Sequence, residues 1–277
     1  MPAPETAFVL GGGGVLGACE VGMLKALLEH GIRPDVIVGT SIGALNGAFV
    51  AADPQPATAK RLESLWRDMV AGEVFSGSLL QRAGTFAKTR THLHPFGPLR
   101  RMLRETLPVE RIEDLEVPFQ CVAASIERAA EHWFTDGPLA DAVLASCAVP
   151  GLLAPVRIGD EHFMDGGLVH SIPVGRAVAL GAKTVYVLQV GRVEQPLVAP
   201  RRPWEVGLVA FEIARRHRFA TDMASIPEGV AVHVLPVGDE PPRYDSRAAL
   251  RYRDLRSVGS RVDRAYEATS AYLAEQA

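Results

Sequence analysis

The fold of this chain is decided by one stretch near its beginning, Ala7-Phe8-Val9-Leu10-Gly11-Gly12-Gly13-Gly14-Val15-Leu16-Gly17. Its first four residues are apolar and four glycines follow at once, which is typical of a short buried strand that ends in a tight loop. After the loop, apolar residues recur at helical spacing at positions 16, 19, 23, 27 and 28, and the pattern ends near Gly31. A strand, a glycine loop and a helix in this order predict an α/β fold.

The same alternation of short apolar runs and longer helical patterns continues along the chain. We expect strands at 35–38, 119–125, 131–135, 156–158, 161–164, 184–190 and 230–235, of which 184–190 has the most convincing pattern of a central strand. We expect helices at 56–71, at 173–181 and up to residue 148, and further helices that start near residues 42, 204 and 257. These elements predict a single three-layer domain over 1–277 with a mostly parallel central sheet flanked by helices, a core at about 7–190 and a helical C-terminal part at 204–277.

The overall composition excludes several classes of protein. The chain has 277 residues and a formal net charge of −3, so nucleic acid is not expected as a partner. The N-terminus lacks the pattern of a signal peptide, and charge, proline or glycine interrupts every apolar stretch too early for a membrane span. Cys19, Cys121 and Cys147 are widely spaced, which is typical of buried thiols in a reducing compartment. We therefore expect a soluble, cytoplasmic protein with at most peripheral membrane contact.

The glycine-rich loop by itself allows two functions. Gly12, Gly14 and Gly17 match the G-x-G-x-x-G pattern of dinucleotide-binding loops. That fold also requires an acidic residue at the far end of its second strand, whereas Asp35 stands at the start of that strand here. A P-loop would need Lys-Ser or Lys-Thr after Gly17, and neither follows. Backbone amides at a strand–helix junction also suit a developing negative charge, so nucleotide binding and an oxyanion hole both stay open.

A second motif, Gly39-Thr40-Ser41-Ile42-Gly43, has the G-x-S-x-G form of a nucleophile elbow. It lies between an expected strand and an expected helix, where a sharp turn presents a serine oxygen above the sheet. For an isolated pentapeptide the alternative is a helix-capping serine in a plain turn. Because the glycine loop precedes it on the neighbouring strand, we predict that Ser41 is a nucleophile and that Gly39 and Gly43 support its turn.

A serine hydroxyl needs a base, and the eight histidines offer no compelling one. His217 belongs to Arg215-Arg216-His217-Arg218, which is typical of a solvated helix face, and His233 lies inside an expected strand. His92 and His94 have no nearby carboxylate or cysteine, so we expect no metal site. The other candidate base is Asp165 in Asp165-Gly166-Gly167, at the end of an expected strand, although Asp-Gly is also common in plain turns.

Taken in order, the three motifs resemble those of the patatin-like phospholipases, in which a glycine-rich oxyanion loop, a G-x-S-x-G elbow and an Asp-Gly-Gly or Asp-Gly-Ala motif follow one another. The flanking segments are also similar, namely Ala145-Ser146-Cys147-Ala148-Val149-Pro150 and Ala154-Pro155-Val156 before the aspartate, and Leu168 and Ile172-Pro173-Val174 after it. The similarity runs from about residue 7 to residue 190.

This resemblance implies a mechanism without a cofactor or a metal. It implies Ser41 as nucleophile, Asp165 as general base and the backbone amides of Gly12, Gly13 and Gly14 as oxyanion hole, with Gly17, Gly166 and Gly167 as supporting residues. Many members of the family carry Lys or Arg just before the last glycine of the loop, where this chain has Leu16. The amides remain, but a positive charge that would help bind an anionic head group is missing from that position.

The function predicted from these residues is hydrolysis of a carboxylic ester of a lipid, of the phospholipase A or lipid acyl hydrolase type. A carboxylesterase or thioesterase acting on short acyl chains would use the same residues, whereas a nucleotide-binding protein would use only the glycine loop. Residues 72–107 carry six basic residues interleaved with apolar ones. This pattern predicts either an ordinary surface segment or a lid that contacts an anionic membrane surface.

Overall fold

A computed structural model of the chain describes residues 3–71, 97–107, 109–190, 196–238 and 255–276. Within these ranges, an eight-stranded sheet has the order β5-β6-β3-β2-β1-β7-β8, with β4 paired to β3. The strands are β1 (Thr6–Leu10), β2 (Val36–Thr40), β3 (Phe119–Ser125), β4 (Ala130–Phe134), β5 (Val156–Ile158), β6 (Glu161–Asp165), β7 (Thr184–Leu188) and β8 (Ala231–Val234).

The sheet is parallel over its centre and one edge and antiparallel towards the other edge. β1 pairs in parallel with β2 and β7, β2 pairs in parallel with β3, and β7 with β8. The β3–β4, β3–β6 and β5–β6 pairings are antiparallel, and Gly159-Asp160 forms the turn between β5 and β6. The predicted α/β fold and both predicted hairpins are confirmed, in a sheet that is mixed.

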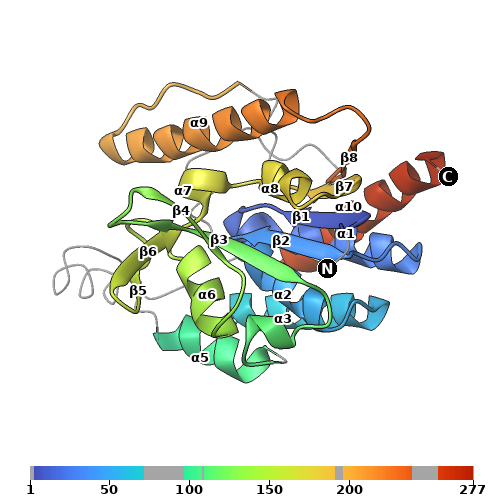
Figure 1. Cartoon of the computed structure of the whole chain (residues 1–277), viewed down its shortest axis with the longest axis horizontal. Helices are drawn as coiled ribbons and strands as arrows, with labels where there is room; N and C mark the ends of the chain where they lie inside the picture. Colours follow the sequence, from blue (N-terminus) through green and yellow to red (C-terminus); the bar gives the residue numbers. More distant parts are fainter. Residues whose placement is uncertain (1–2, 72–96, 108, 191–195, 239–254, 277) are drawn as a thin grey trace.

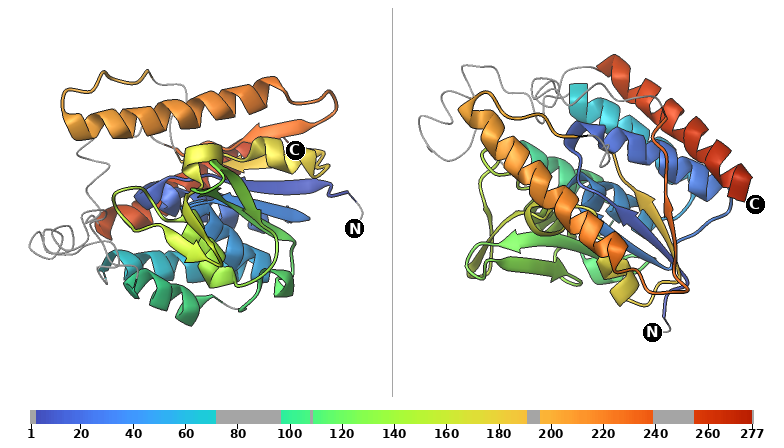
Figure 2. Two further views of the ribbon diagram at one scale, coloured as in Figure 1. Left: turned by 60° about the vertical axis from the view of Figure 1, so that its left-hand side comes forward. Right: turned by 90° about the horizontal axis from the view of Figure 1, so that it is seen from above.

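Helices cover both faces of the sheet (Figure 1). One face carries α1 (Ala18–Glu29), α2 (Ile42–Ala52), α3 (Pro56–Ala71), α5 (Gly97–Thr106), α6 (Leu139–Ser146) and α10 (Leu255–Gln276). The other face carries α7 (Gly167–His170), α8 (Val174–Ala179) and α9 (Pro203–Ala224), and α9 is the outermost helix on this side (Figures 1 and 2). Two short 3₁₀ helices, η1 (Gly14–Gly17) and η2 (Ile112–Asp114), precede α1 and β3.

The apolar residues of β1 explain why helices are needed on both faces. Successive side chains of a strand point to opposite faces of the sheet. Phe8 and Leu10 belong to the core under α1, α2 and α3, whereas Ala7 and Val9 belong to the core under α8 and α9. A strand that is apolar on both faces is stable only when both are covered.

The bounds of β2 differ from the predicted strand at 35–38. Asp35 lies outside the strand because its carboxylate accepts hydrogen bonds from the backbone amides of Glu5 (3.0 Å) and Thr6 (2.9 Å). At the other end the strand continues to Thr40, which pairs with Val122 of β3. β2 therefore ends directly before Ser41.

The predicted lid at 72–107 falls partly outside the described residues, since 72–96 are not described. Its last part is helix α5, in which Leu99 and Leu103 are buried against the core. The lid hypothesis stays a prediction.

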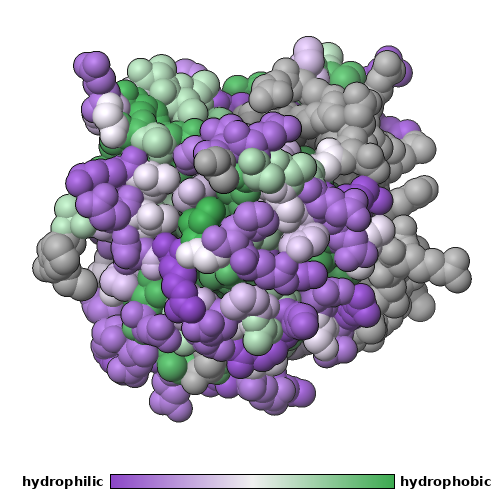
Figure 3. All heavy atoms as spheres, turned by 90° about the vertical axis from the view of Figure 1, so that its right-hand side faces the viewer, coloured by the Kyte–Doolittle hydropathy of each residue, from purple (hydrophilic) through white to green (hydrophobic). Residues whose placement is uncertain are grey.

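No helix within the described ranges is both long and apolar enough to cross a membrane. Seen from the side at which α10 ends, the surface is mainly hydrophilic, with hydrophobic residues in small separate patches (Figure 3).

Candidate active site

Ser41 occupies a strained turn between β2 and α2. Its backbone angles are φ 54° and ψ −124°, a conformation that residues other than glycine rarely adopt. The flanking glycines are required by close packing: a Cβ on Gly39 would lie 2.7 Å from Ala44 Cα, and one on Gly43 would lie 2.4 Å from the Leu10 carbonyl oxygen. This strand–turn–helix geometry lifts a serine side chain out of the sheet, as a nucleophile elbow does.

Strand β3 brings Ser41 and Asp165 together although 124 positions separate them in the sequence. One edge of β3 is occupied by β4 over residues 121–125. β2 and β6 therefore share the other edge, where Thr40 pairs with Val122 and Asp165 pairs with Ala123. Because these are consecutive positions of β3, the ends of β2 and β6 meet, and Ser41 lies beside Asp165.

The two side chains are joined by a short hydrogen bond. Ser41 Oγ donates to Asp165 Oδ2 at 2.6 Å, and the Gly167 amide donates to Asp165 Oδ1 at 2.7 Å. Ser41 is 7% exposed and Asp165 is 2% exposed. The carboxylate is thus oriented by one backbone donor and directed at the serine hydroxyl from a buried position.

Burial changes the chemistry of this carboxyl group. It raises the pKa of Asp165 from the ordinary value of 3.8 to about 6, although the hydrogen bonds from Ser41 and Gly167 lower it. A carboxylate with a raised pKa is a stronger base, and it remains ionised at neutral pH. Asp165 can therefore accept the proton of the Ser41 hydroxyl while the serine oxygen attacks an electrophile.

The backbone of Ser41 is held by Ser146, the last residue of α6. Ser146 Oγ accepts a hydrogen bond from the Ser41 amide (2.8 Å) and donates to the Val122 carbonyl oxygen (2.7 Å). Two residues later, the Ala148 carbonyl oxygen accepts from the Asp165 amide (2.9 Å). The end of α6 and the residues after it thus hold both members of the pair.

The glycine loop leaves β1 next to Ser41. A Cβ on Gly12 would lie 3.4 Å from both Ser41 Cβ and Ser171 Oγ, so both serine side chains face the same side of Gly12. The Gly12 amide donates to the Ser171 carbonyl oxygen (2.9 Å), whereas no described residue accepts a hydrogen bond from the amides of Gly13 and Gly14. Of the three predicted oxyanion donors, Gly12 is thus engaged with Ser171, and the other two have no acceptor within the described ranges.

A buried network joins the exit of this loop to α2. Asn46 Nδ2 donates to the Gly17 carbonyl oxygen (3.0 Å) and to Glu20 Oε2 (2.8 Å), and Trp66 Nε1 donates to Asn46 Oδ1 (3.0 Å). Burial raises the pKa of Glu20 well above its usual range. A Cβ on Gly17 would lie 2.7 Å from the Ile42 side chain, so the loop and the helix after Ser41 pack directly together.

The two glycines after Asp165 allow equally close packing. A Cβ on Gly166 would lie 2.2 Å from the Val122 carbonyl oxygen, and one on Gly167 would lie 2.7 Å from Phe211 Cζ and 2.9 Å from Asp165 Oδ1. A side chain at either position would displace β6 from β3 or push against the carboxylate.

The histidines considered as bases lie elsewhere. His217 is exposed on α9, and His233 stacks on Tyr186 with ring centroids 4.9 Å apart while hydrogen-bonding the Tyr272 hydroxyl (2.9 Å). His92 and His94 lie outside the described residues.

The prediction that Arg215-Arg216-His217-Arg218 forms a solvated face is wrong for its first two residues, and the Arg216 side chain is only 17% exposed. Arg215 is only 6% exposed, because the side of α9 that carries it lies against α7 and the residues that follow it. Its Nε donates to Ser171 Oγ, which was not predicted to belong to the site.

Ser146 and Asn46 were not predicted as supporting residues either. Each is a polar residue within an apolar helix that is buried almost throughout, and this is the signal that could have found them. Both are fully buried, so each needs hydrogen-bond partners. Those of Ser146 hold the turn at Ser41, and those of Asn46 hold the exit of the glycine loop.

Among the described residues, the cysteines and the remaining acidic groups do not provide a second centre. Cys19, Cys121 and Cys147 are free thiols. Burial raises the pKa of Cys147 well above its ordinary value, which disfavours a thiolate next to Ser41. Within the described ranges, no three His, Cys, Asp or Glu side chains form a group that could hold a metal ion.

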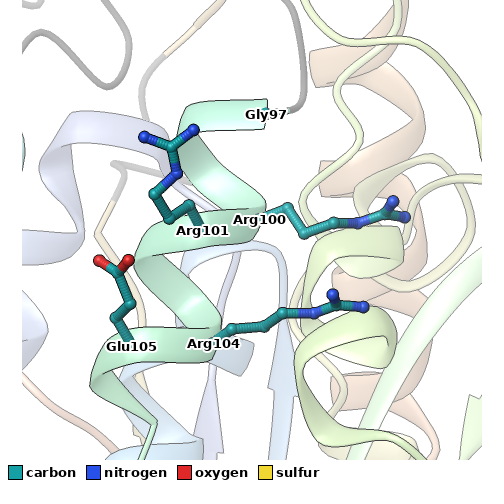
Figure 4. Close-up of a pocket in the computed structure, with 5 residues that line it drawn as sticks. All are labelled: Gly97, Arg100, Arg101, Arg104 and Glu105. Carbon is teal, nitrogen blue, oxygen red and sulfur yellow. The ribbon is translucent and has the colours of Figure 1, made fainter.

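A separate hollow lies along α5, lined by Gly97, Arg100, Arg101, Arg104 and Glu105. Arg100 and Arg104 point to the same side of α5 (Figure 4), where each approaches Asp141 of α6, at 3.6 Å and 3.8 Å. Asp141 lies in the first turn of α6, whereas Ser146, at the other end of that helix, contacts Ser41. The hollow is thus a surface feature distinct from the Ser41–Asp165 pair.

Comparison with known proteins gives the following similarities. A family model described as "Patatin-like phospholipase" matches residues 8–178. "Lysophospholipase nte1" of Aspergillus terreus is 33% identical over 198 residues, which cover 69% of this chain and 12% of that protein. Human "Patatin-like phospholipase domain-containing protein 6" is 33% identical over 187 residues, covering 67% of this chain and 13% of that protein. The chain thus spans only a small part of the length of these relatives.

Solved structures that match this chain include VipD from Legionella pneumophila, with a TM-score of 0.46 and 14% identity over 99% of this chain and 67% of that one. ExoU, in its complex with SpcU from Pseudomonas aeruginosa, has a TM-score of 0.39 and 16% identity over 99% of this chain and 52% of that one.

Proposed function

This chain belongs to the patatin-like phospholipase family, and on that premise we propose that it hydrolyses carboxylic esters of lipids with Ser41 as nucleophile and Asp165 as general base. The observation that carries this proposal is the 2.6 Å hydrogen bond from Ser41 Oγ to Asp165 Oδ2, made by a serine on a strained turn. A plain capping serine would direct its oxygen at the amides of its own helix, and Ser41 makes no such bond.

The chemistry follows from the positions of these groups. Asp165 accepts the hydroxyl proton while Ser41 Oγ attacks the ester carbonyl carbon, and the electron pair of the C=O bond moves to its oxygen. The tetrahedral intermediate collapses, the leaving alcohol takes the proton from Asp165, and an acyl group remains on Ser41. Water then attacks the acyl group with Asp165 again as base, which releases the fatty acid and restores the serine.

The glycine loop would stabilise the negative charge on the carbonyl oxygen of the intermediate. We assign the hydrogen bonds to this oxygen to the amides of Gly13 and Gly14, because the Gly12 amide already donates to Ser171. Gly12 then anchors the loop to the main chain of Ser171. One such donor is worth roughly 3 kcal/mol of transition-state stabilisation, so the loop accounts for a large share of the rate.

The substrate class is proposed from the family and from the relatives' names. The relative from Aspergillus terreus is named as a lysophospholipase, which makes a lysophospholipid the first lipid to test. A carboxylesterase or thioesterase with the same pair would prefer short acyl chains, and peripheral membrane contact and a cytoplasmic location also stay predictions.

The test combines a fluorophosphonate probe, p-nitrophenyl esters of graded chain length and a lysophospholipid. Ser41→Ala should abolish labelling and turnover, and Asp165→Asn should lower kcat by at least about 10²-fold, the usual contribution of a positioned base. Ser225→Ala and Asp160→Asn, which alter exposed residues, should behave as wild type.

Each result decides between candidate functions. A preference for long acyl chains supports the lipid hydrolase, and a preference for short chains supports the esterase. Wild-type protein that neither labels nor turns over any ester contradicts the proposal and returns the glycine loop to nucleotide binding, to be tested with NAD and ATP.

A further inference from the structure

Arg215 is a buried cation next to the site that the proposed mechanism does not use. It lies on α9, beyond the residues 8–178 that match the family model. Its side chain is 6% exposed, and burial lowers its pKa. Burying a guanidinium costs free energy unless its donors are paired, so the partners of Arg215 indicate what holds it there.

Those partners link Arg215 to the glycine loop. Its Nε donates to Ser171 Oγ (3.0 Å), and its Nη1 donates to Glu212 Oε1 (3.1 Å). Ser171 is 2% exposed, and its carbonyl oxygen accepts from the Gly12 amide (2.9 Å). Arg215 thus binds the side chain of Ser171, and the main chain of Ser171 binds Gly12.

The Ser171 hydroxyl also lies near Gly12, on the side of Gly12 that faces Ser41. The position of a Cβ on Gly12 is 3.4 Å from Ser171 Oγ and 3.4 Å from Ser41 Cβ. A shift of Ser171 would move the acceptor of the Gly12 amide, and with it the loop, relative to the nucleophile.

We propose that Arg215 is a positioning residue for the oxyanion loop, acting through Ser171 to hold Gly12, and with it Gly13 and Gly14, at the correct distance from Ser41. The inference rests on the proposed function. The charge of Arg215 is offset by Glu212, so its main effect is on geometry.

The expected kinetic effect is specific. The loop contacts the carbonyl oxygen most strongly after it becomes negatively charged, so a displaced loop weakens binding of the transition state more than binding of the substrate. A displacement of about 1 Å in such a site lowers rates by up to about 10²-fold. Loss of the Arg215 contact should therefore lower kcat with little change in KM.

The test is a double-mutant cycle with Arg215→Met and Ser171→Ala, using a p-nitrophenyl ester as substrate. Each single variant should lower kcat by about 10-fold or more while KM stays within about twofold. The double variant should be no slower than the slower single variant, because both substitutions remove the same hydrogen bond between Arg215 and Ser171. Arg216→Met is the matched control, since Arg216 lies near the same carboxylate oxygen of Glu212 (3.7 Å), and its kcat should equal that of wild type.

Other outcomes overturn the inference. A folded Arg215→Met variant with wild-type kcat, or effects of the two substitutions that multiply, would show that Arg215 does not act through Ser171. If Arg215→Met does not fold, Arg215→Lys takes its place. Lysine keeps the charge but lacks the Nε–H group that donates a hydrogen bond to Ser171. If wild-type protein hydrolyses no ester, the proposed function and this inference both fail; if it does and the cycle is additive, only this inference fails.

Discussion

At the scale of single residues, Asp165 is subject to opposing effects. Burial raises its pKa to about 6, and the hydrogen bonds from Ser41 and Gly167 lower it. A general base accepts a proton only as a carboxylate, so the protonated form is inactive. We predict that kcat/KM increases with pH up to a pKa of about 6 and is constant above it, as a pH–rate profile of the free enzyme would report.

The Asp165→Asn variant is the control for this prediction. Its side chain does not titrate, so the residual activity should show no inflection at the wild-type position. An inflection that persists in Asp165→Asn would mean that another group is the base.

At the scale of elements, the elbow depends on how closely α2 approaches the end of β1. A Cβ on Gly43 would lie 2.4 Å from the Leu10 carbonyl oxygen and 2.7 Å from the Gly11 carbonyl oxygen. Backbone atoms cannot rotate away, so the helix and the loop must separate. We predict that Gly43→Ala lowers the free energy of unfolding by about 1–3 kcal/mol, measured by urea denaturation, and lowers kcat as well.

Gly207 offers a matched control, because it is also a helical glycine. Nothing lies within 4 Å of a Cβ at this exposed position of α9. Gly207→Ala should raise the free energy of unfolding by about 0.5–1 kcal/mol, since alanine loses less backbone entropy in a helix. Equal effects of the two substitutions would contradict the steric explanation.

At the scale of the whole molecule, Asp222 joins three helices on one face of the sheet. Its carboxylate accepts from His170 Nε2 of α7 (2.6 Å), from the Gly175 amide of α8 (3.2 Å) and from Arg218 Nε of its own helix α9 (3.2 Å). Burial acts to raise the pKa of Asp222, but the hydrogen bond and the charge interaction with His170 lower it below the usual range. We predict that Asp222→Asn lowers the free energy of unfolding at pH 7 by about 2 kcal/mol.

The pH dependence of this loss follows from the direction of the shift. Because the pKa of Asp222 is lower in the folded than in the unfolded chain, its ionised form stabilises the fold above the ordinary aspartate value of about 3.9 and stops doing so as the pH falls through the folded value. The difference between wild type and Asp222→Asn should therefore shrink in acid. Asp160→Asn, which breaks an exposed ion pair with Arg157, should cost less than about 1 kcal/mol at any pH. A similar loss in both variants would contradict a linking role for Asp222.

Much of the fold could be predicted because each element depends on a few neighbouring residues. The helix predicted at 56–71 is α3 (Pro56–Ala71), and the strand predicted at 119–125 is β3 (Phe119–Ser125). Apolar periodicity, glycine and turn residues encode such elements locally. The predicted start of a strand at Asp35 is wrong because of a contact distant in sequence. The Asp35 carboxylate accepts hydrogen bonds from the amides of Glu5 and Thr6.

The sequence by itself therefore determined the three motifs, their order and the elements on which they lie. Only the tertiary structure decided which residues meet: Ser41 and Asp165 lie side by side because β2 and β6 end at consecutive positions of β3. Only the structure likewise revealed Arg215 as buried, because the side of α9 that carries it lies against α7 and Ser171. The physical reason is that burial and long-range hydrogen bonds depend on sheet register and helix packing, which no local pattern contains.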